Sequence, residues 1–321
     1  MNNNILEIKD LSVIYKTKKG ILGSPKTVHA VNNVSLDIKK GEILAIAGES
    51  GCGKSTLAKA VMKLVEAQNG EILLENNNIL KFKKREDLKK FYQKVQIIFQ
   101  NPYSSLNPKM KIGQILKEPL EINTAFSKKE IEAIVEDKIK KVGLDKNCLN
   151  LYPHEFSGGQ RQRIAIARAL ILEPEFIIAD EPVSALDVSI QAQIINLLKQ
   201  LKDDSNLTFL FISHDLSVIK YISDRIAIMY LGEIIEIGET EEIFNAPKHP
   251  YTKALLSAVP QLNGNAKEQI HLSGELPSPE NIPAGCKFHT RCPFVMESCK
   301  HDNPQEIIFS HTHKCKCFLY N

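Results

Sequence analysis

Short apolar runs alternate with amphipathic segments along most of this 321-residue chain. The apolar runs, at residues 42–47, 176–179 and 208–213, are typical of buried strands in a parallel sheet. Helical spacing or position after a strand predicts helices at residues 54–65, 128–142, 158–172 and 189–201. Because strands and helices alternate, we expect an α/β core built on a parallel sheet.

The remaining patterned segments predict further strands outside that alternation. Residues 6–15 mix apolar and polar positions and suggest an edge strand, and residues 28–38 and 71–75 suggest two more. Residues 226–237 predict a hairpin that turns at Gly232, and residues 21–27 predict a loop.

Composition describes a compact protein without a general affinity for nucleic acid. Hydrophobic residues make up 43% and charged residues 25%, but the net charge is only +3. No apolar stretch approaches the roughly 20 residues of a spanning helix, and the start Met1–Asn4 does not resemble a signal peptide. We therefore expect the chain to stay in the cytoplasm and to need a membrane-spanning partner for any work at a membrane.

Cysteines are crowded at one end of the chain. Cys52 and Cys148 stand alone, whereas five others lie in the last few dozen residues, at Cys286, Cys292, Cys299, Cys315 and Cys317. In a reducing cytoplasm such a cluster favours metal or iron–sulfur ligation over disulfides. The break in composition predicts a small C-terminal appendage.

A glycine-rich segment between a predicted strand and a predicted helix carries the sharpest chemical signal. It has the pattern Gly-x4-Gly-Lys-Ser and comprises Gly48, Glu49, Ser50, Gly51, Cys52, Gly53, Lys54, Ser55 and Thr56. Glycines let backbone N–H groups surround phosphate oxygens at a helix N-terminus. Lys54 would pair with the outer phosphates, Ser55 would hold Mg²⁺, and Cys52 would be a small filler. The alternative, a plain glycine-rich turn, does not account for this context.

Two other segments carry anion or metal chemistry. The apolar run 176–179 ends in Asp180, which suits a Mg²⁺-bound water, and in Glu181, which suits the attacking water. Ser157-Gly158-Gly159-Gln160 opens a predicted helix. The residues alone leave open whether this segment only caps the helix or also binds a phosphate.

Together these motifs resemble the ATPase subunits of ABC transporters over about residues 5–245. The resemblance rests on the order of Gly48–Ser55, Gln100, Ser157–Gln160, Asp180-Glu181, Ser184–Asp187 and His214; Phe156 stands where leucine is usual. It implies a P-loop NTPase core with a helical subdomain at about 101–170 and an N-terminal antiparallel β subdomain. The ATPase domain would span 1–246, and a Cys-rich C-terminal extension would span 247–321.

The resemblance also implies residue roles around ATP and Mg²⁺. Glu181, His214 and Gln100 would be catalytic, and Gln100 would join Ser55 and Asp180 at Mg²⁺. Tyr15 would stack on adenine, with an edge-strand core aromatic as the alternative. The signature residues Ser157, Gly158, Gly159 and Gln160 would close over ATP held by the opposite subunit. Asp187 would link the two halves of that dimer.

Three segments resemble the oligopeptide/dipeptide importers, a group that includes nickel and glutathione importers. They are residues 99–108, 152–157 and 249–256, and the loop 20–26 resembles the second of two paired ATPases. The resemblance implies a heterodimer with a paralogous ATPase at the cytoplasmic face of the membrane. It also implies two permease subunits and, indirectly, an extracellular peptide-binding protein, with no nucleic acid. Cargo choice would lie in those partners.

The tail resembles the C-terminal module of the same group. That resemblance implies a [4Fe-4S] cluster held by Cys286, Cys292, Cys299 and Cys317, although Cys315 also fits as the fourth ligand. Zinc, with His289, His311 and His313 nearby, and metal-free thiols are the alternatives.

Three rival classes fit the sequence less well. A ribosome-acting ABC protein usually carries two ATPase units in one chain, and a DNA-repair or iron–sulfur-assembly ATPase is suggested only by the cysteines. The segment 99–156 is too short for the coiled-coil insertion of the repair type. A non-catalytic regulator would be favoured if Glu181 or His214 were missing, and both are present.

Overall fold

The computed structural model describes residues 3–17, 26–259, 270, 272 and 274–320. Its strands are β1 (Asn4–Thr17), β2 (Lys26–Lys39), β3 (Ile43–Ala47), β4 (Asn69–Leu74), β5 (Asn77–Asn78), β6 (Val95–Ile98), β7 (Phe176–Asp180), β8 (Thr208–Ile212), β9 (Arg225–Tyr230), β10 (Glu233–Glu239), β11 (Glu306–Ile308) and β12 (Lys314–Lys316). Its α-helices are α1 (Lys54–Val61), α2 (Arg85–Lys94), α3 (Pro102–Ser105), α4 (Ile112–Asn123), α5 (Lys128–Lys141), α6 (Gly158–Leu170), α7 (Val188–Ser205), α8 (Leu216–Ile222), α9 (Thr240–Asn245), α10 (Pro250–Ser257) and α11 (Glu297–His301).

The central sheet has the strand order β11-β12-β10-β9-β3-β8-β7-β6. Strands β9, β3, β8, β7 and β6 run parallel, and β3, β7 and β8 are buried along their whole length. Parallel strands need helical crossovers that cover both faces, which explains the near-continuous apolar runs. The predicted parallel α/β core is confirmed, and so is the hairpin at Gly232, formed by β9 and β10.

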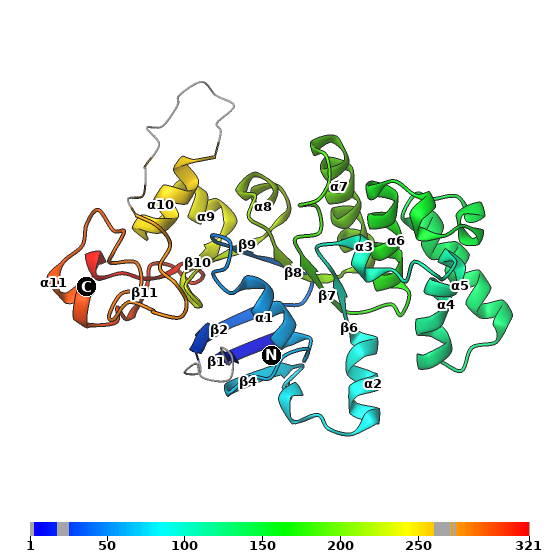
Figure 1. Ribbon diagram of the computed structural model, residues 1–321, viewed down its shortest axis with the longest axis horizontal. Helices are drawn as coiled ribbons and strands as arrows, with labels where there is room; N and C mark the ends of the chain where they lie inside the picture. Colours follow the sequence, from blue (N-terminus) through cyan, green and yellow to red (C-terminus); the bar gives the residue numbers. More distant parts are fainter. Residues whose placement is uncertain (1–2, 18–25, 260–269, 271, 273, 321) are drawn as a thin grey trace.

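A second, antiparallel sheet in the order β2-β1-β4-β5 forms the N-terminal β subdomain. The prediction of an edge strand at residues 6–15 is wrong, because β1 pairs with β2 on one side and β4 on the other. Its alternation arises because Leu6 and Ile8 face the core while Lys9 is exposed. Helix α1 packs between the two sheets (Figure 1). It ends at Val61 rather than at 65, since Lys63 adopts a left-handed φ of 56°.

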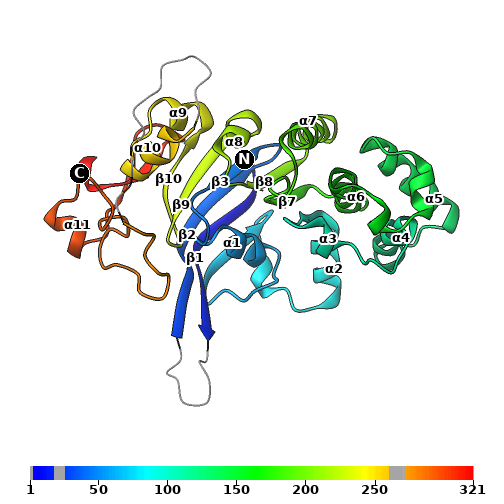
Figure 2. The same ribbon diagram turned by 45° about the horizontal axis from the view of Figure 1, so that its top comes forward.

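The helical subdomain lies at the opposite side of the core from the C-terminal strands (Figures 1 and 2). Helices α4, α5 and α6 bury an apolar cluster that continues onto the central sheet through Ile98 and Ala179. The prediction of a helix at 128–142 is confirmed by α5, whose start is fixed by a capping box between Ser127 and Glu130. This subdomain carries the segment 157–160 at the start of α6.

The C-terminal extension is joined to the core by strand pairing that the sequence did not predict. Strand β12 pairs with β10, and β11 pairs with β12. Each is only three residues long, so its alternation is too short to recognise. Of the predicted loop at 21–27, residues 21–25 lie outside the described residues, and Lys26 and Thr27 belong to β2.

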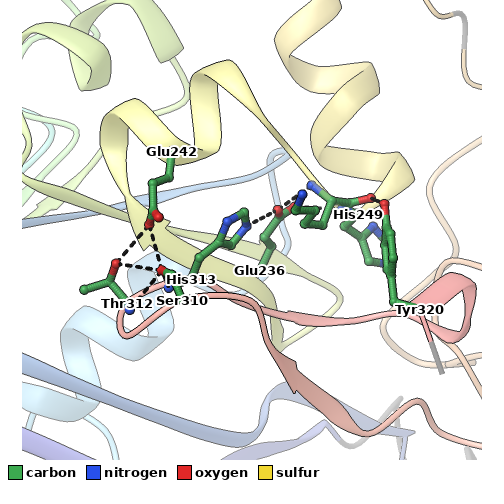
Figure 3. A network of polar contacts seen from close by, with 8 residues as sticks. Glu236, Glu242, His249, Ser310, Thr312, His313 and Tyr320 are labelled. Atoms are coloured by element: carbon green, nitrogen blue, oxygen red, sulfur yellow. Dashed lines mark hydrogen bonds and ion pairs between the residues drawn. The ribbon is translucent and has the colours of Figure 1, made fainter.

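A buried polar network fastens the extension to β10 (Figure 3). The Glu236 carboxylate lies 2.8 Å from His313 Nε2 and accepts backbone N–H bonds from Lys248 and His249. Hydrogen bonds of this kind lower the pKa of Glu236 in spite of burial, which acts in the opposite direction. A buried carboxylate with several partners is stable in its charged form, so β10, the start of α10 and the tail are held in one arrangement.

Candidate functional site: a nucleotide pocket at the ends of the parallel strands

The loop between β3 and α1 is shaped by two glycines that no other residue could replace without strain. Gly48 has φ 154°, and a Cβ atom there would lie 2.2 Å from the Met229 carbonyl oxygen. Gly53 has φ 113°, and its Cβ would lie 2.1 Å from the Ala30 oxygen. The loop therefore packs tightly against the main chain of neighbouring strands and leads directly into the N-terminus of α1, where a helix favours an anion.

Lys54 occupies the inside of this loop. Its Nζ donates to the carbonyl oxygens of Gly48 at 2.7 Å and Glu49 at 3.0 Å, and its side chain is buried. Cys52 is also buried, with its sulfur 3.7 Å from Lys54 Nζ. The ammonium group is thus placed where phosphate oxygens held by the loop would meet it.

Oxygen ligands for a hard cation lie beside the loop. Ser55 Oγ donates to Asp180 Oδ1 at 2.9 Å, which joins α1 to the end of β7. Burial raises the pKa of Asp180, while the Ser55 hydroxyl lowers it. A hydroxyl and a largely buried carboxylate in contact suit Mg²⁺, which prefers oxygen ligands.

Glu181 directly follows β7 and lies beside the ends of the two strands β6 and β8. Gln100, which follows β6, donates its Nε2 to Glu181 Oε2 at 2.8 Å, and His214, which follows β8, has its Nδ1 3.4 Å from the same oxygen. Glu181 has a left-handed φ of 48°, rare for a glutamate, and its N–H donates to Ile212 O. Such strain is typical of functional sites and turns the carboxylate away from the strand direction into the pocket.

These groups open into one cavity of about 590 Å³. The predicted site residues that line it are Tyr15, Ser50, Gly51, Gly53, Lys54, Ser55, Thr56, Gln100, Glu181 and His214. Tyr15 is 36% exposed and lies with Val28 and Ala30 on the side formed by the antiparallel sheet. Gly48, Glu49, Cys52 and Asp180 do not line the cavity and instead support the residues that do. The volume is suitable for a nucleotide.

The segment 157–160 and Asp187 do not line this cavity. Ser157 caps α6: its Oγ accepts from Gln160 N–H, and Gln160 Oε1 accepts from Ser157 N–H. The segment therefore caps the helix and lies outside the nucleotide cavity of its own chain. Asp187 is exposed at the start of α7.

Sequence reasoning missed three contacts from the C-terminal extension. Pro279 lines the nucleotide cavity, the Tyr251 hydroxyl accepts from Glu49 N–H, and Arg291 pairs with the Glu49 carboxylate. Tyr251 belongs to the segment 249–256, whose only sequence signal is its resemblance to the oligopeptide/dipeptide importers. No local pattern could have connected it with a loop about two hundred residues earlier.

The C-terminal cysteines lie in one region, and the sulfur atoms of several accept backbone N–H bonds. Phe294 N–H donates to Cys292 Sγ at 3.4 Å. The pKa of Cys286 is raised to about 11, mainly by burial and also by the nearby thiols of Cys299, Cys317 and Cys292, while the Phe288 N–H acts in the opposite direction. Burial likewise raises the pKa of Cys317, against a bond from Leu319 N–H.

Within the described residues, however, no three histidine, cysteine or acidic side chains are arranged closely enough to hold a metal ion together. In the same part of the chain, no helix is both long and apolar enough to cross a membrane.

The fold and the pocket define a P-loop ATPase of the ABC type. Residues 31–184 match the ABC transporter family, and residues 235–299 match the C-terminal region of oligopeptide/dipeptide transporters. The dimeric ATP-binding cassette MJ0796, solved in a post-hydrolysis state with ADP and Pi, superposes with a TM-score of 0.65 at 30% identity, covering 73% of this chain and 98% of that one. The cassette cbiO1 of Clostridium perfringens gives 0.65 at 28% identity, covering 76% and 92%.

Curated relatives match over nearly the whole length. The dipeptide transport ATP-binding protein DppF of Haemophilus influenzae is 50% identical, covering 94% of this chain and 93% of the relative. The oligopeptide transport ATP-binding protein AppF of Bacillus subtilis is 47% identical with 99% and 98% covered, and OppF of Salmonella typhimurium is 49% identical with 97% and 95% covered. The chain belongs to the ATP-binding subunits of the oligopeptide/dipeptide family of ABC transporters, and it is an ATP-hydrolysing enzyme.

Proposed function

We propose that this chain hydrolyses ATP to drive import of oligopeptides or dipeptides through a membrane transporter. The observation that carries the proposal is the combination in one chain of a pocket that joins the phosphate loop to Gln100, Glu181 and His214 and of the C-terminal region matched at residues 235–299. Relatives at about 50% identity are named for dipeptide or oligopeptide transport. Nickel and glutathione remain the competing cargoes.

The pocket supports a division of labour in hydrolysis. The loop N–H groups and Lys54 would bind the phosphates, Tyr15 would stack on adenine, and Glu181 would orient the attacking water. His214 and Gln100, which both contact the Glu181 carboxylate, would keep it in place. When bound through Ser55, Asp180 and Gln100, Mg²⁺ would neutralise charge on the outer phosphates.

The site is proposed to be completed by a second ATPase. Ser157, Gly158, Gly159 and Gln160 lie away from the pocket of their own chain, in agreement with a role across a dimer, and exposed Asp187 would lie near that interface. A heterodimer with a paralogous ATPase would bind two permease subunits at the cytoplasmic face of the membrane. An extracellular peptide-binding protein would deliver cargo to the permeases.

Two functional regions follow from this proposal. Residues 1–246, including the helical subdomain at about 101–170, would form the ATPase domain. Residues 247–321 would form the extension, which is anchored through β12 and the Glu236 network.

Reconstitution tests the cargo. The chain would be co-expressed with its neighbouring ATPase and permease genes, placed in vesicles and supplied with the cognate binding protein loaded with a peptide mixture, nickel or glutathione. Peptide-loaded binding protein should stimulate ATP hydrolysis and peptide uptake. Stimulation by nickel or glutathione alone would contradict the peptide proposal while leaving the ATPase standing.

We also propose a [4Fe-4S] cluster on Cys286, Cys292, Cys299 and Cys317. The N–H···S bonds to Cys286, Cys292 and Cys317 support these ligands, because such bonds stabilise thiolates. Cys315 is not among these three cysteines; it lies buried in β12, opposite Glu236 of β10. The described side chains do not form a group arranged to hold a metal ion, so the four thiols would have to move together to bind a cluster.

Elemental analysis of anaerobically purified protein tests the ligand set. It should find about four irons and matching sulfide per chain. Cys292→Ser should lose the brown colour, whereas Cys52→Ser, which changes a cysteine of the phosphate loop outside the ligand set, should keep it. Zinc in place of iron would overturn the cluster but not the ligands.

A further inference from the structure

The C-terminal extension contacts the phosphate-binding loop at Glu49. Arg291 Nη1 lies 3.1 Å from Glu49 Oε1 and 2.9 Å from Oε2, so one guanidinium nitrogen bridges both carboxylate oxygens. The Tyr251 hydroxyl accepts from Glu49 N–H at 2.9 Å. Side chain and main chain of one loop residue are thus both held by residues outside the ATPase core motifs.

These contacts lie in protected surroundings. Arg291 is only 9% exposed and Tyr251 is fully buried, while the Glu49 side chain is partly exposed. A shielded, charge-assisted pair is considerably stronger than an exposed surface ion pair. These contacts therefore restrain both the side chain and the main chain of Glu49.

The restraint continues to Lys54. The Glu49 carbonyl oxygen accepts from Lys54 Nζ at 3.0 Å, so the peptide units on either side of Glu49 bond to Tyr251 and to Lys54. A shift of Glu49 would consequently move the carbonyl that positions the lysine ammonium. Because phosphate binding depends on the exact position of the loop, small displacements should weaken nucleotide affinity.

Arg291, which holds Glu49, belongs to the segment that carries the C-terminal cysteines. Arg291 directly precedes Cys292, and Phe288 lies in the same loop. The centre of the Phe288 ring lies 5.5 Å from that of Tyr251 and 5.4 Å from that of Tyr230. Tyr230 is the last residue of β9 and follows Met229, whose carbonyl group packs against Gly48. An aromatic cluster and an ion pair thus join the cysteine segment to the phosphate loop as one packed unit.

We infer that Arg291 is a positioning residue of the ATP site, which holds the phosphate loop through Glu49 and couples nucleotide binding to the order of the cysteine segment. The inference rests on the proposed ATPase function. Coupling between two sites is reciprocal, so ATP should stabilise residues 285–301 as much as that segment stabilises bound ATP. A purely structural fastening of the extension would show neither effect.

Nucleotide affinity provides the first test, in the full chain carrying Glu181→Gln to slow hydrolysis. A fluorescent ATP analogue with Mg²⁺ should bind about tenfold more weakly after Arg291→Ala or Glu49→Gln, the loss of one charge-assisted bond. Arg291→Lys should recover part of the affinity. Lys300→Ala, which removes a cation from an exposed pair in the same module, is the matched control and should bind normally.

The double variant separates coupling from general damage. If Arg291 acts through Glu49, then Arg291→Ala with Glu49→Gln should bind no more weakly than either single variant. Glu49→Gln leaves the extension's own residues unchanged, so it tests the contact even if Arg291→Ala unfolds the module. Fully additive losses, or normal affinity in Glu49→Gln, would overturn the inference.

Hydrogen exchange gives the reciprocal readout. Adding Mg-ATP should slow amide exchange in residues 285–301 of the parent, and this protection should disappear in Glu49→Gln at ATP concentrations that still saturate it. Unchanged exchange in the parent would contradict the coupling. Failure of the parent to bind ATP at all would instead contradict the proposed function.

Discussion

At the scale of single residues, Glu181 shows what could and could not be predicted from the sequence. Its proposed role follows from its place at the end of an apolar strand that runs into two acidic residues. Its left-handed backbone and its contacts with Gln100 and His214 depend on three neighbouring strands meeting at one edge. Arg291 could not be predicted at all, because its partner lies 242 residues earlier and neither residue forms a local pattern.

Replacing Glu181 by glutamine tests the residue most directly. The amide keeps the side-chain size but cannot orient and polarise water as a carboxylate does, so hydrolysis should fall by on the order of a hundredfold or more. ATP affinity should remain, because Lys54 and the loop are untouched. Single-turnover hydrolysis and equilibrium binding in the assembled transporter separate the two effects; near-normal turnover would remove Glu181 from catalysis.

At the scale of elements, the parallel strands were predictable and the tail was not. A buried strand such as β7 can be recognised from its continuous apolar run, and a helix such as α5 from the spacing of its apolar residues and from its N-cap. Strands β11 and β12 exist because β10 offers an edge and Glu236 offers a partner for His313. Tertiary pairing of this kind leaves no trace in a three-residue segment.

Helix α10 provides a pH-dependent prediction at this scale. Its N-cap His249 is fully buried, accepts from Tyr251 N–H through Nδ1, and has its pKa lowered by burial to about 4. The folded state binds this proton less well than the unfolded state, in which the histidine has its ordinary pKa of about 6.5. The contribution of neutral His249 to the free energy of unfolding is therefore fully present above pH 6.5. It should fall by up to about 3 kcal/mol as the pH drops from 6.5 to 4.

His249→Asn provides the comparison, because asparagine can cap the helix and does not titrate. Urea unfolding at pH 7 and pH 5 should show a smaller loss of unfolding free energy in the variant than in the parent. The other histidines and Glu236 are present in both proteins, so the difference isolates residue 249. An equal loss in both would show that the buried imidazole contributes nothing to acid sensitivity.

At the scale of the whole molecule, the proposed site is divided between surfaces that do not meet within one chain. The pocket lies at the carboxyl ends of the parallel strands, whereas Ser157 starts α6 in the helical subdomain and does not line the pocket. The solved cassette MJ0796 is a dimer. Both parts of the proposed site carry a sequence motif, and the proposal needs a second chain to bring them together.

Assembly with its partner subunits should control how fast the chain hydrolyses ATP. The purified chain should bind Mg-ATP, since the loop, Lys54 and Tyr15 are all its own, but it should hydrolyse ATP slowly and with a rate that rises with protein concentration. Adding the paired ATPase and the permeases should raise turnover per chain. Ser157→Arg should abolish that increase while leaving ATP binding to the isolated chain intact, because Ser157 lies outside its own pocket. Full activity from a chain shown by light scattering to be monomeric would contradict the shared site.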